Sequence, residues 1–264
     1  TTRTNRFRAY LMKKLFLCTL YIVTLSLFLA CQKKEQSFQY NVDKFYDLEI
    51  LRYDVPEFES LTLQQKSLLY CLSEAALWGR DILFDQNCKY NLKVRKTIEA
   101  VLNSYQGDLE SEDFQNFVVY AKRVFFSNGI HHHYAEDKFF PEISEAYFAD
   151  LVKGSDASLL PLNEGETVDD FITFLTPVIF DKELYKMRRS SEDDIIANSA
   201  VNFYEGDICK ADVEDFYGKM RQPNDATPTS YGLNSKLVKE DGKIYEDVYK
   251  ADGLYGEAIQ AIIG

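Results

Sequence analysis

Apolar residues recur at helical spacing along most of residues 61–225. The first stretch opens at Thr62, with Gln65 three residues later, which is the pattern of a capping box. The third stretch opens at Ser111 and follows i, i+3, i+4, i+7 spacing. The apolar positions expected to be buried in the three stretches are Leu68, Leu69, Leu72, Ala75, Ala76 and Ile82; Val94, Ile98, Val101, Leu102 and Tyr105; and Phe114, Phe117, Val118, Ala121, Val124 and Phe125. These patterns predict three successive helices.

Four more helices are predicted along the chain, separated by a loop rich in Gly, His, Tyr and Lys and by a linker-like stretch. Acidic pairs near the start of two of these helices would favour the helix dipole. The predicted helices cover residues 142–153, 168–174, 191–203 and 212–220; the acidic pairs are Asp169/Asp170 and Asp193/Asp194, the loop is 127–141 and the linker 159–167.

The pattern changes in residues 231–249, where two alternating runs flank Asp241-Gly242. Asp-Gly between alternating runs is a strong hairpin signal. A further amphipathic pattern starts at Tyr255 and carries Ala258, Ile259, Ile262 and Ile263. We therefore expect an α+β fold, predominantly helical, with a helical region over 61–225 and a β-hairpin followed by the start of another helix over 226–264.

The first part of the sequence has the pattern of a targeting segment. Met12 is followed by Lys13 and Lys14, and then by an apolar run that ends at Ala30. This order is typical of a secretory signal peptide, and the run is shorter than the ~20 residues of a spanning helix. Leu29-Ala30-Cys31 resembles a bacterial lipoprotein cleavage box, although Phe28 stands where Leu is usual.

The segment boundaries follow from this pattern. Residues 1–11 read as upstream read-through, 12–30 as a lipoprotein signal peptide and 31–60 as a tether and N-terminal segment. Cys31 is the predicted lipidation site, which predicts a cell-envelope location, periplasmic or on the surface, with membrane contact through the lipid anchor only. The alternatives are an ordinary transmembrane anchor or a signal cut elsewhere.

Charge and composition restrict the possible partners. The 264 residues carry 42 Asp and Glu against 30 Lys and Arg, a formal net charge of −12. An acidic chain lacks the basic footprint that nucleic-acid binding needs, so no nucleic-acid partner is expected. The step Arg188-Arg189 is interpreted as solvated surface.

Cysteine and histidine spacing gives no metal motif. The sequence contains no Cys-x-x-Cys and no His-Glu-x-x-His, and its three histidines, 131–133, are consecutive. Consecutive side chains point in different directions on a helix or strand, so no metal site is expected in this chain. Cys71 lies in an apolar helical run and is expected to be a buried small hydrophobe.

Residues 129–141 read Gly-Ile-His-His-His-Tyr-Ala-Glu-Asp-Lys-Phe-Phe-Pro. This resembles the Gly-Asn-Tyr-Lys-Ser-Phe-Gly-Asp-Thr-Lys-Phe-x-Pro loop of the dipeptidyl peptidase III family of zinc exopeptidases. Residues 72–79 and 234–248 look like two further family stretches, Leu-Ser-x-Ala-Ala-Trp-Tyr-Gly and Asn-x-x-Leu-x-Lys with its Gly-Lys-x-Tyr-x-x-Val return. The leader and the His-His-His-Tyr variant look like the bacterial, Bacteroides-like branch.

The resemblance implies a fold and a site. It places the chain in the N-terminal part of the lower lobe of a two-lobed peptidase, with helices around a β-barrel core and the hairpin in that core. In the family, a Ser-Phe pair of the loop lines the peptide cleft. Those positions are His133 and Tyr134 here, so both are candidate substrate contacts, with His132 and Asn128 as secondary candidates. The alternative is a loop with only a structural role.

The family's zinc ligands lie in a His-Glu-x-x-x-Gly-His motif and a later Glu-Glu-x-x-Arg-Ala-Asp, both in the upper lobe. Neither motif occurs in residues 1–264. The resemblance therefore implies zinc in the full-length protein, no catalytic residue in this chain, and a chain that is inactive without the missing C-terminal part. The expected partners are short peptides, which the full-length enzyme would shorten by dipeptides from the N-terminus.

Two other hypotheses stay open at this stage. The chain is a non-enzymatic helical cell-envelope lipoprotein that binds peptides or scaffolds a complex, or it is a pseudo-enzyme without an upper lobe. A fragment is expected to leave the helix after residue 255 and the hairpin without partners, whereas a complete protein is expected to bury Ile259, Ile262 and Ile263.

Overall fold

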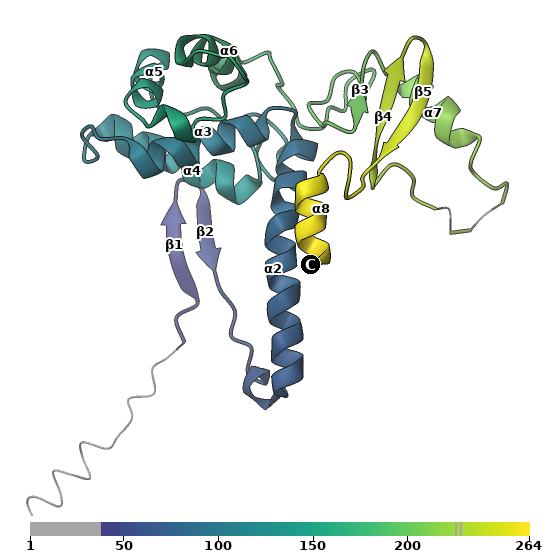
Figure 1. Cartoon of the computed structure of the whole chain (residues 1–264), viewed down its shortest axis with the longest axis horizontal. Helices are drawn as coiled ribbons and strands as arrows, with labels where there is room; N and C mark the ends of the chain where they lie inside the picture. The colour runs from purple at the N-terminus through teal and green to yellow at the C-terminus, as the bar shows by residue number, and fades with distance from the viewer. Residues whose placement is uncertain (1–37, 225, 228) are drawn as a thin grey trace, which may run out of the picture. The chain divides into compact units, whose positions relative to one another are not determined.

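The structure is a computed structural model that describes residues 38–224, 226–227 and 229–264. The chain divides into two compact units, Thr1–Pro56 and Glu57–Gly264. The described residues form an α+β fold with seven α-helices, α2 to α8, and two small sheets (Figure 1). The predicted read-through, the signal peptide and Cys31 lie outside the described residues.

The first unit contains a β-hairpin for which the sequence analysis predicted no strand. Strand β1 (Asn41–Phe45) pairs antiparallel with β2 (Leu48–Leu51). Tyr46 in the connecting turn has a φ of 51°, a conformation that tight turns require and that few non-glycine residues adopt. The predicted tether and N-terminal segment, 31–60, therefore includes regular structure after residue 40.

The second unit begins with α2 (Leu63–Asn87), the longest helix. The predicted capping box is confirmed, because the Thr62 side chain accepts from the Gln65 N–H and the Gln65 side chain accepts from the Thr62 N–H. Next come α3 (Asn91–Ser104) and α4 (Glu112–Ser127), and Ser111 caps α4 as predicted.

Two shorter helices complete the bundle. Helix α5 (Glu145–Lys153) starts three residues later than predicted, because Ser144 takes the N-cap position. After the 3-10 turn η2 (Ala157–Leu159), α6 (Val168–Phe180) runs six residues beyond its predicted end. The largest fully buried side chains of this bundle are Ile98, Phe117, Phe148, Leu151, Phe171, Leu175 and Ile179.

A three-stranded sheet follows. Strand β3 (Tyr204–Glu205) runs parallel to β4 (Ser235–Glu240), and β4 pairs antiparallel with β5 (Lys243–Val248). The predicted two-residue turn is confirmed, since Asp241 and Gly242 both have positive φ, at 50° and 74°, as a type I′ turn requires.

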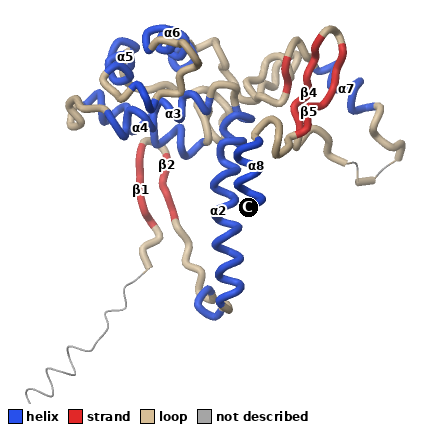
Figure 2. The backbone as a smooth tube through the Cα atoms, in the orientation of Figure 1, coloured by secondary structure: helices blue, strands red, loops and turns tan. Residues whose placement is uncertain are grey.

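Helices α7 (Lys210–Gly218) and α8 (Gly256–Ile263) complete the described elements. Tyr217 of α7 packs in a small core with Ile208 and Leu237. Helix α8 lies beside α2 (Figure 2). It buries Ala258, leaves Ile259 half-buried and exposes Ile262 and Ile263.

The helix predicted over 191–203 is wrong. This segment consists of turns and bends. One Asp194 carboxylate oxygen accepts from the N–H groups of Ile196, Ala197 and Lys210. Such local side-chain hydrogen bonds offer the backbone an alternative to the helical pattern. The pair Asp193/Asp194 therefore does not occupy a helical first turn.

The burial predicted for α2 is also wrong in part. Leu68, Leu69, Cys71, Leu72 and Ala76 are exposed, whereas Ala75 and Ile82 are half-buried. The residues 68–72 are all apolar or weakly polar, so this run has no single apolar face to turn toward the bundle. None of the helices in the described part of the chain combines the length and apolar character that crossing a membrane would need.

Candidate functional site

The candidate loop starts where α4 ends. Asn128 is the C-cap of α4 with left-handed backbone, φ 52°, and Gly129 follows with φ 144°. A Cβ on Gly129 would lie 2.1 Å from the side-chain amide nitrogen of Asn91, so this position requires glycine. Asn91 Oδ1 accepts from the Ile130 N–H at 3.2 Å, and Asn87 Nδ2 donates to the Asn128 carbonyl at 3.0 Å. Asn128 thus takes part through its backbone.

Backbone hydrogen bonds hold the loop on two sides. Within it, the His132 N–H donates to the Asp137 carbonyl at 2.8 Å, and the Glu136 N–H donates to the His132 carbonyl at 3.0 Å. Along residues 186–188, the Arg188 N–H donates to the Glu136 carbonyl at 2.8 Å and the Lys138 N–H to the Lys186 carbonyl at 3.0 Å. The loop therefore has a defined conformation although it is neither helix nor strand.

A bidentate ion pair clamps the loop. Glu136 accepts from Arg188 Nε at 2.7 Å and from Arg188 Nη2 at 2.6 Å, and both side chains are about 15% exposed. Arg188 Nη2 also donates to the His133 carbonyl at 3.3 Å. These hydrogen bonds to Arg188, joined by one from Arg189, lower the pKa of Glu136 to about 2. Paired guanidinium and carboxylate groups are geometrically specific as well as strong.

The clamp corrects the interpretation of the step Arg188-Arg189. Arg189 is exposed, as predicted, but Arg188 is largely buried and reaches across to the loop. Sequence reasoning missed this role because Arg188 and Glu136 lie 52 residues apart and no local spacing links them.

Two more titratable groups support the loop from inside. His131 is buried, and its Nε2 lies 2.7 Å from the Tyr185 carbonyl oxygen, so Nε2 carries the proton. Burial lowers the pKa of His131 to about 4. Lys138 Nζ donates to the carbonyls of Asp181 at 2.6 Å and Leu184 at 3.0 Å, and burial lowers its pKa to about 8. Both groups hold backbone rather than face a ligand.

The rings of His132, His133 and Tyr134, which follow His131 in the chain, form a contiguous stack at the surface. The His132 and His133 rings are stacked with centroids 4.6 Å apart, and the Tyr134 ring is tilted by 52° against His133, also at 4.6 Å. Phe126 of α4 meets His133 edge-on at 5.0 Å. His132 Nδ1 accepts from the N–H groups of Tyr134 and Ala135, so this nitrogen is unprotonated. Tyr134 is 83% exposed, so the stack ends in an aromatic face open to solvent.

The structure brings three of the four predicted contact residues together. His132, His133 and Tyr134 share the stack, whereas Asn128 lies at the start of the loop and no contact places its side chain in the stack. Phe126 was missed. The available signal was an aromatic residue at a position outside the helical spacing of the apolar face of α4, and the structure leaves it exposed.

The side chains around the loop determine which kinds of ligand it could bind. In the described ranges, no three His, Cys, Asp or Glu side chains are grouped so that they could hold a metal ion. The loop instead presents stacked rings and backbone groups. Beside it, residues 183–200 line a pocket of about 530 Å³ whose wall includes Tyr185, Ser190, Asn198 and Ser199.

No protein-family model matches the chain, and no curated protein matches its sequence. The resemblance to the dipeptidyl peptidase III family therefore rests on the three quoted stretches of sequence.

Proposed function

We propose that the loop 128–141 is a peptide-contact site, with Tyr134 and His133 as its contact residues. The observation that carries this proposal is the exposed ring of Tyr134, packed against His133 in the loop that the Glu136–Arg188 clamp holds. Aromatic rings with a polar tip suit peptide surfaces, because they offer apolar area and a hydrogen-bonding group together. A loop that is ordered before binding loses less conformational freedom when a ligand arrives.

In the wider proposal, the chain is the N-terminal part of the lower lobe of a zinc-dependent dipeptidyl peptidase, with the hairpin β4–β5 in a β-barrel core. The full-length enzyme releases dipeptides from the N-terminus of short peptides. Zinc held by the upper lobe would activate a water molecule, so the chain 1–264 would bind peptide but be inactive alone. The support for this wider proposal is the sequence resemblance to the dipeptidyl peptidase III family.

Peptide binding tests the site directly. Isothermal titration of the full chain with a tetrapeptide series should give binding that Tyr134→Ala weakens by roughly 2- to 10-fold, the range expected for the loss of one aromatic contact. Tyr134→Phe should keep most of the affinity. Tyr53→Ala, which removes another highly exposed tyrosine, is the matched control. Equal affinity for the wild type and Tyr134→Ala would contradict the proposal.

The lipoprotein proposal has its own test. If Cys31 is the acylated N-terminus of a cell-envelope protein, cells given a labelled fatty acid should incorporate it into the chain. Cys31→Ser should abolish the labelling, whereas Cys71→Ser, which removes an exposed cysteine in α2, should leave it intact. Labelling that survives Cys31→Ser would reject the anchor.

A non-enzymatic role is the second candidate, a helical lipoprotein that binds peptides or scaffolds a complex. The apolar surface that α2 exposes favours it. The two candidates differ in one measurement, the zinc-dependent release of dipeptides by the full-length protein, which only the peptidase proposal predicts. Release by the purified chain 1–264 would refute the claim that the chain alone is inactive.

A further inference from the structure

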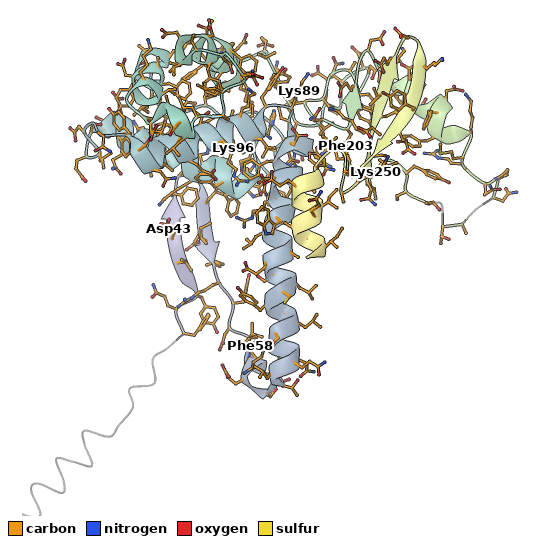
Figure 3. The ribbon with its side chains drawn as sticks, viewed as in Figure 1. Asp43, Phe58, Lys89, Lys96, Phe203 and Lys250 are labelled. Atoms are coloured by element: carbon orange, nitrogen blue, oxygen red, sulfur yellow. The ribbon has the colours of Figure 1, made fainter. Side chains whose placement is uncertain are left out.

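The N-terminal part of α2 exposes large apolar side chains on several sides. The exposed ones are Leu63, Leu68, Leu69, Tyr70, Leu72, Leu77 and Trp78. Figure 3 shows side chains projecting along α2, with Phe58 labelled at its N-terminal end. Ala75, Gly79 and Ile82 are half-buried. At about 100° per residue these three share one side of the helix, which we assign to the neighbouring helix α8.

The side of α2 opposite these three residues carries a symmetric pattern. Leu63, Lys66, Tyr70, Glu74 and Leu77 lie within about 80° of one another around the helix axis. The steps between them are three, four, four and three residues. Leu63, Tyr70 and Leu77 are 81%, 66% and 51% exposed. The step lengths along this face are therefore the same when counted from either end. The symmetry relates the cation Lys66 in one half to the anion Glu74 in the other half.

We propose that this face, which we call the α2 face, binds the α2 face of a second copy of the chain, antiparallel and about a two-fold axis at Tyr70. In that alignment Leu63 contacts Leu77 of the other copy, and Lys66 contacts Glu74 of the other copy. The two Tyr70 side chains contact each other at the axis. A two-fold interface must be self-complementary, and this pattern satisfies that requirement. The inference is independent of the proposed function.

Charge decides both the occupant and its orientation. Glu74 forms no ion pair with another residue of the described part of the chain. Lys66 Nζ pairs with Glu59 at 2.8 Å and lies over the Phe58 ring, and its side chain stays 27% exposed. A parallel arrangement would place Lys66 against Lys66 of the other copy. The antiparallel arrangement places each Glu74 against Lys66 of the other copy.

The length of the exposed stretch also fits. The α2 face spans about 21 Å from Leu63 to Leu77, at 1.5 Å per residue. The next residue on this side of the helix is Asp81, whose carboxylate pairs with Arg95 of α3 at 2.5 Å, and Phe84 is the buried residue of α2. In the antiparallel alignment the helical bundles of the two copies therefore lie at opposite ends of the contact.

Charge reversal tests the proposal in the full chain. Sedimentation over a concentration series should show a monomer–dimer equilibrium. Lys66→Glu or Glu74→Lys alone should raise the dissociation constant roughly tenfold or more, because each replaces two attractive pairs with repulsive ones. The double variant should recover the wild-type value. A monomer at every concentration, or self-association that ignores the charge reversals, as association through the apolar leader would, overturns the proposal.

Cross-linking tests the register. Tyr70→Cys should form a disulfide-linked dimer on mild oxidation, because residue 70 faces itself across the axis. All cysteines except the buried Cys88 are replaced by serine in this variant: Cys18, Cys31, Cys71 and Cys209. The chain with Cys71 retained and Tyr70 intact is the control, since Cys71 is exposed but lies about 100° away around the helix. Cross-linking equal to or weaker than that of the control overturns the register.

Discussion

Helices α2 and α3 follow one another in the chain but differ sharply in burial. Helix α2 has 25 residues and buries one, Phe84, whereas α3 has 14 residues and buries six. Both are well-formed helices, so burial did not decide whether they form. In α3 the apolar positions recur at one angle around the helix, and in α2 they fall on every side. The comparison separates what makes a helix from what packs it.

Helix formation is largely local, while packing depends on pattern. The capping box at Thr62 and the straight-chain residues of α2 favour a helix at its start without any tertiary partner. The bundle α3–α6 adds a dense core in which side chains such as Phe117 and Leu151 have almost no exposed surface. We expect mutations in the two regions to differ accordingly.

The largest expected difference comes from truncating an apolar side chain in each region. Phe117→Ala in α4 should lower the free energy of unfolding by about 3–5 kcal/mol, because it opens a cavity in a packed core. Leu72→Ala in α2 removes an exposed side chain away from the α2 face and should cost within about 0.5 kcal/mol. Chemical denaturation of both variants measures the contrast, and equal costs would contradict it.

The next effect is a pH dependence of the free energy of unfolding. We expect it from the buried His131, which follows α4, and not from α2. The pKa of His131 is about 4 in the folded protein, against an ordinary value of 6.5. The folded state therefore binds this proton more weakly, and stability is complete above pH 6.5 and falls as the pH drops toward 4. The loss should be on the order of 3 kcal/mol.

His131→Gln keeps a donor for the Tyr185 carbonyl and removes the titration. Its stability should change less than that of the wild type between pH 6.5 and 4, as denaturation at several pH values would show. The loss that Glu136 contributes as the pH falls from 4.5 to 2 is common to both proteins. An identical pH slope in the two would reject the assignment to His131.

A smaller effect is expected at the clamp. Glu136→Gln should cost about 1–3 kcal/mol, because it leaves the largely buried Arg188 without its carboxylate. Glu183→Gln breaks an exposed pair with Lys186 and should change stability by less than about 1 kcal/mol. Comparison of the two unfolding curves tests whether the clamp stabilises the loop, and matching curves would argue against it.

The smallest expected effect sharpens the comparison at the helix caps. Ser111→Ala removes the cap of α4 and should cost about 1 kcal/mol of global stability. Thr62→Ala removes the cap of α2, where few contacts couple the helix start to the core. It should speed amide hydrogen exchange over the first turns of α2 and leave global unfolding within about 0.5 kcal/mol. A global loss as large as that of Ser111→Ala would show that the start of α2 is coupled to the core.

Sequence reasoning predicted local features of the fold well. The caps at Thr62 and Ser111 and the turn at Asp241-Gly242 were predicted because each depends on residues at most a few positions apart. The loop 128–141 was singled out by its resemblance to a family pattern. The clamp was not predicted, because Arg188 and Glu136 are far apart in the sequence. The helix predicted over 191–203 does not form, because one aspartate, Asp194, accepts hydrogen bonds from the backbone of two segments.

The sequence by itself determined where most helices and the hairpin lie, because propensity, capping and apolar periodicity act over one or two turns. Only the tertiary structure decided that Leu68, Leu69 and Leu72 of α2 are exposed although they were predicted to be buried, whereas Val94 of α3 is buried as its spacing predicted. It also decided that His132, His133 and Tyr134 stack into one surface. Both outcomes depend on which elements meet in space, and neither the spacing nor the composition of a single segment encodes that.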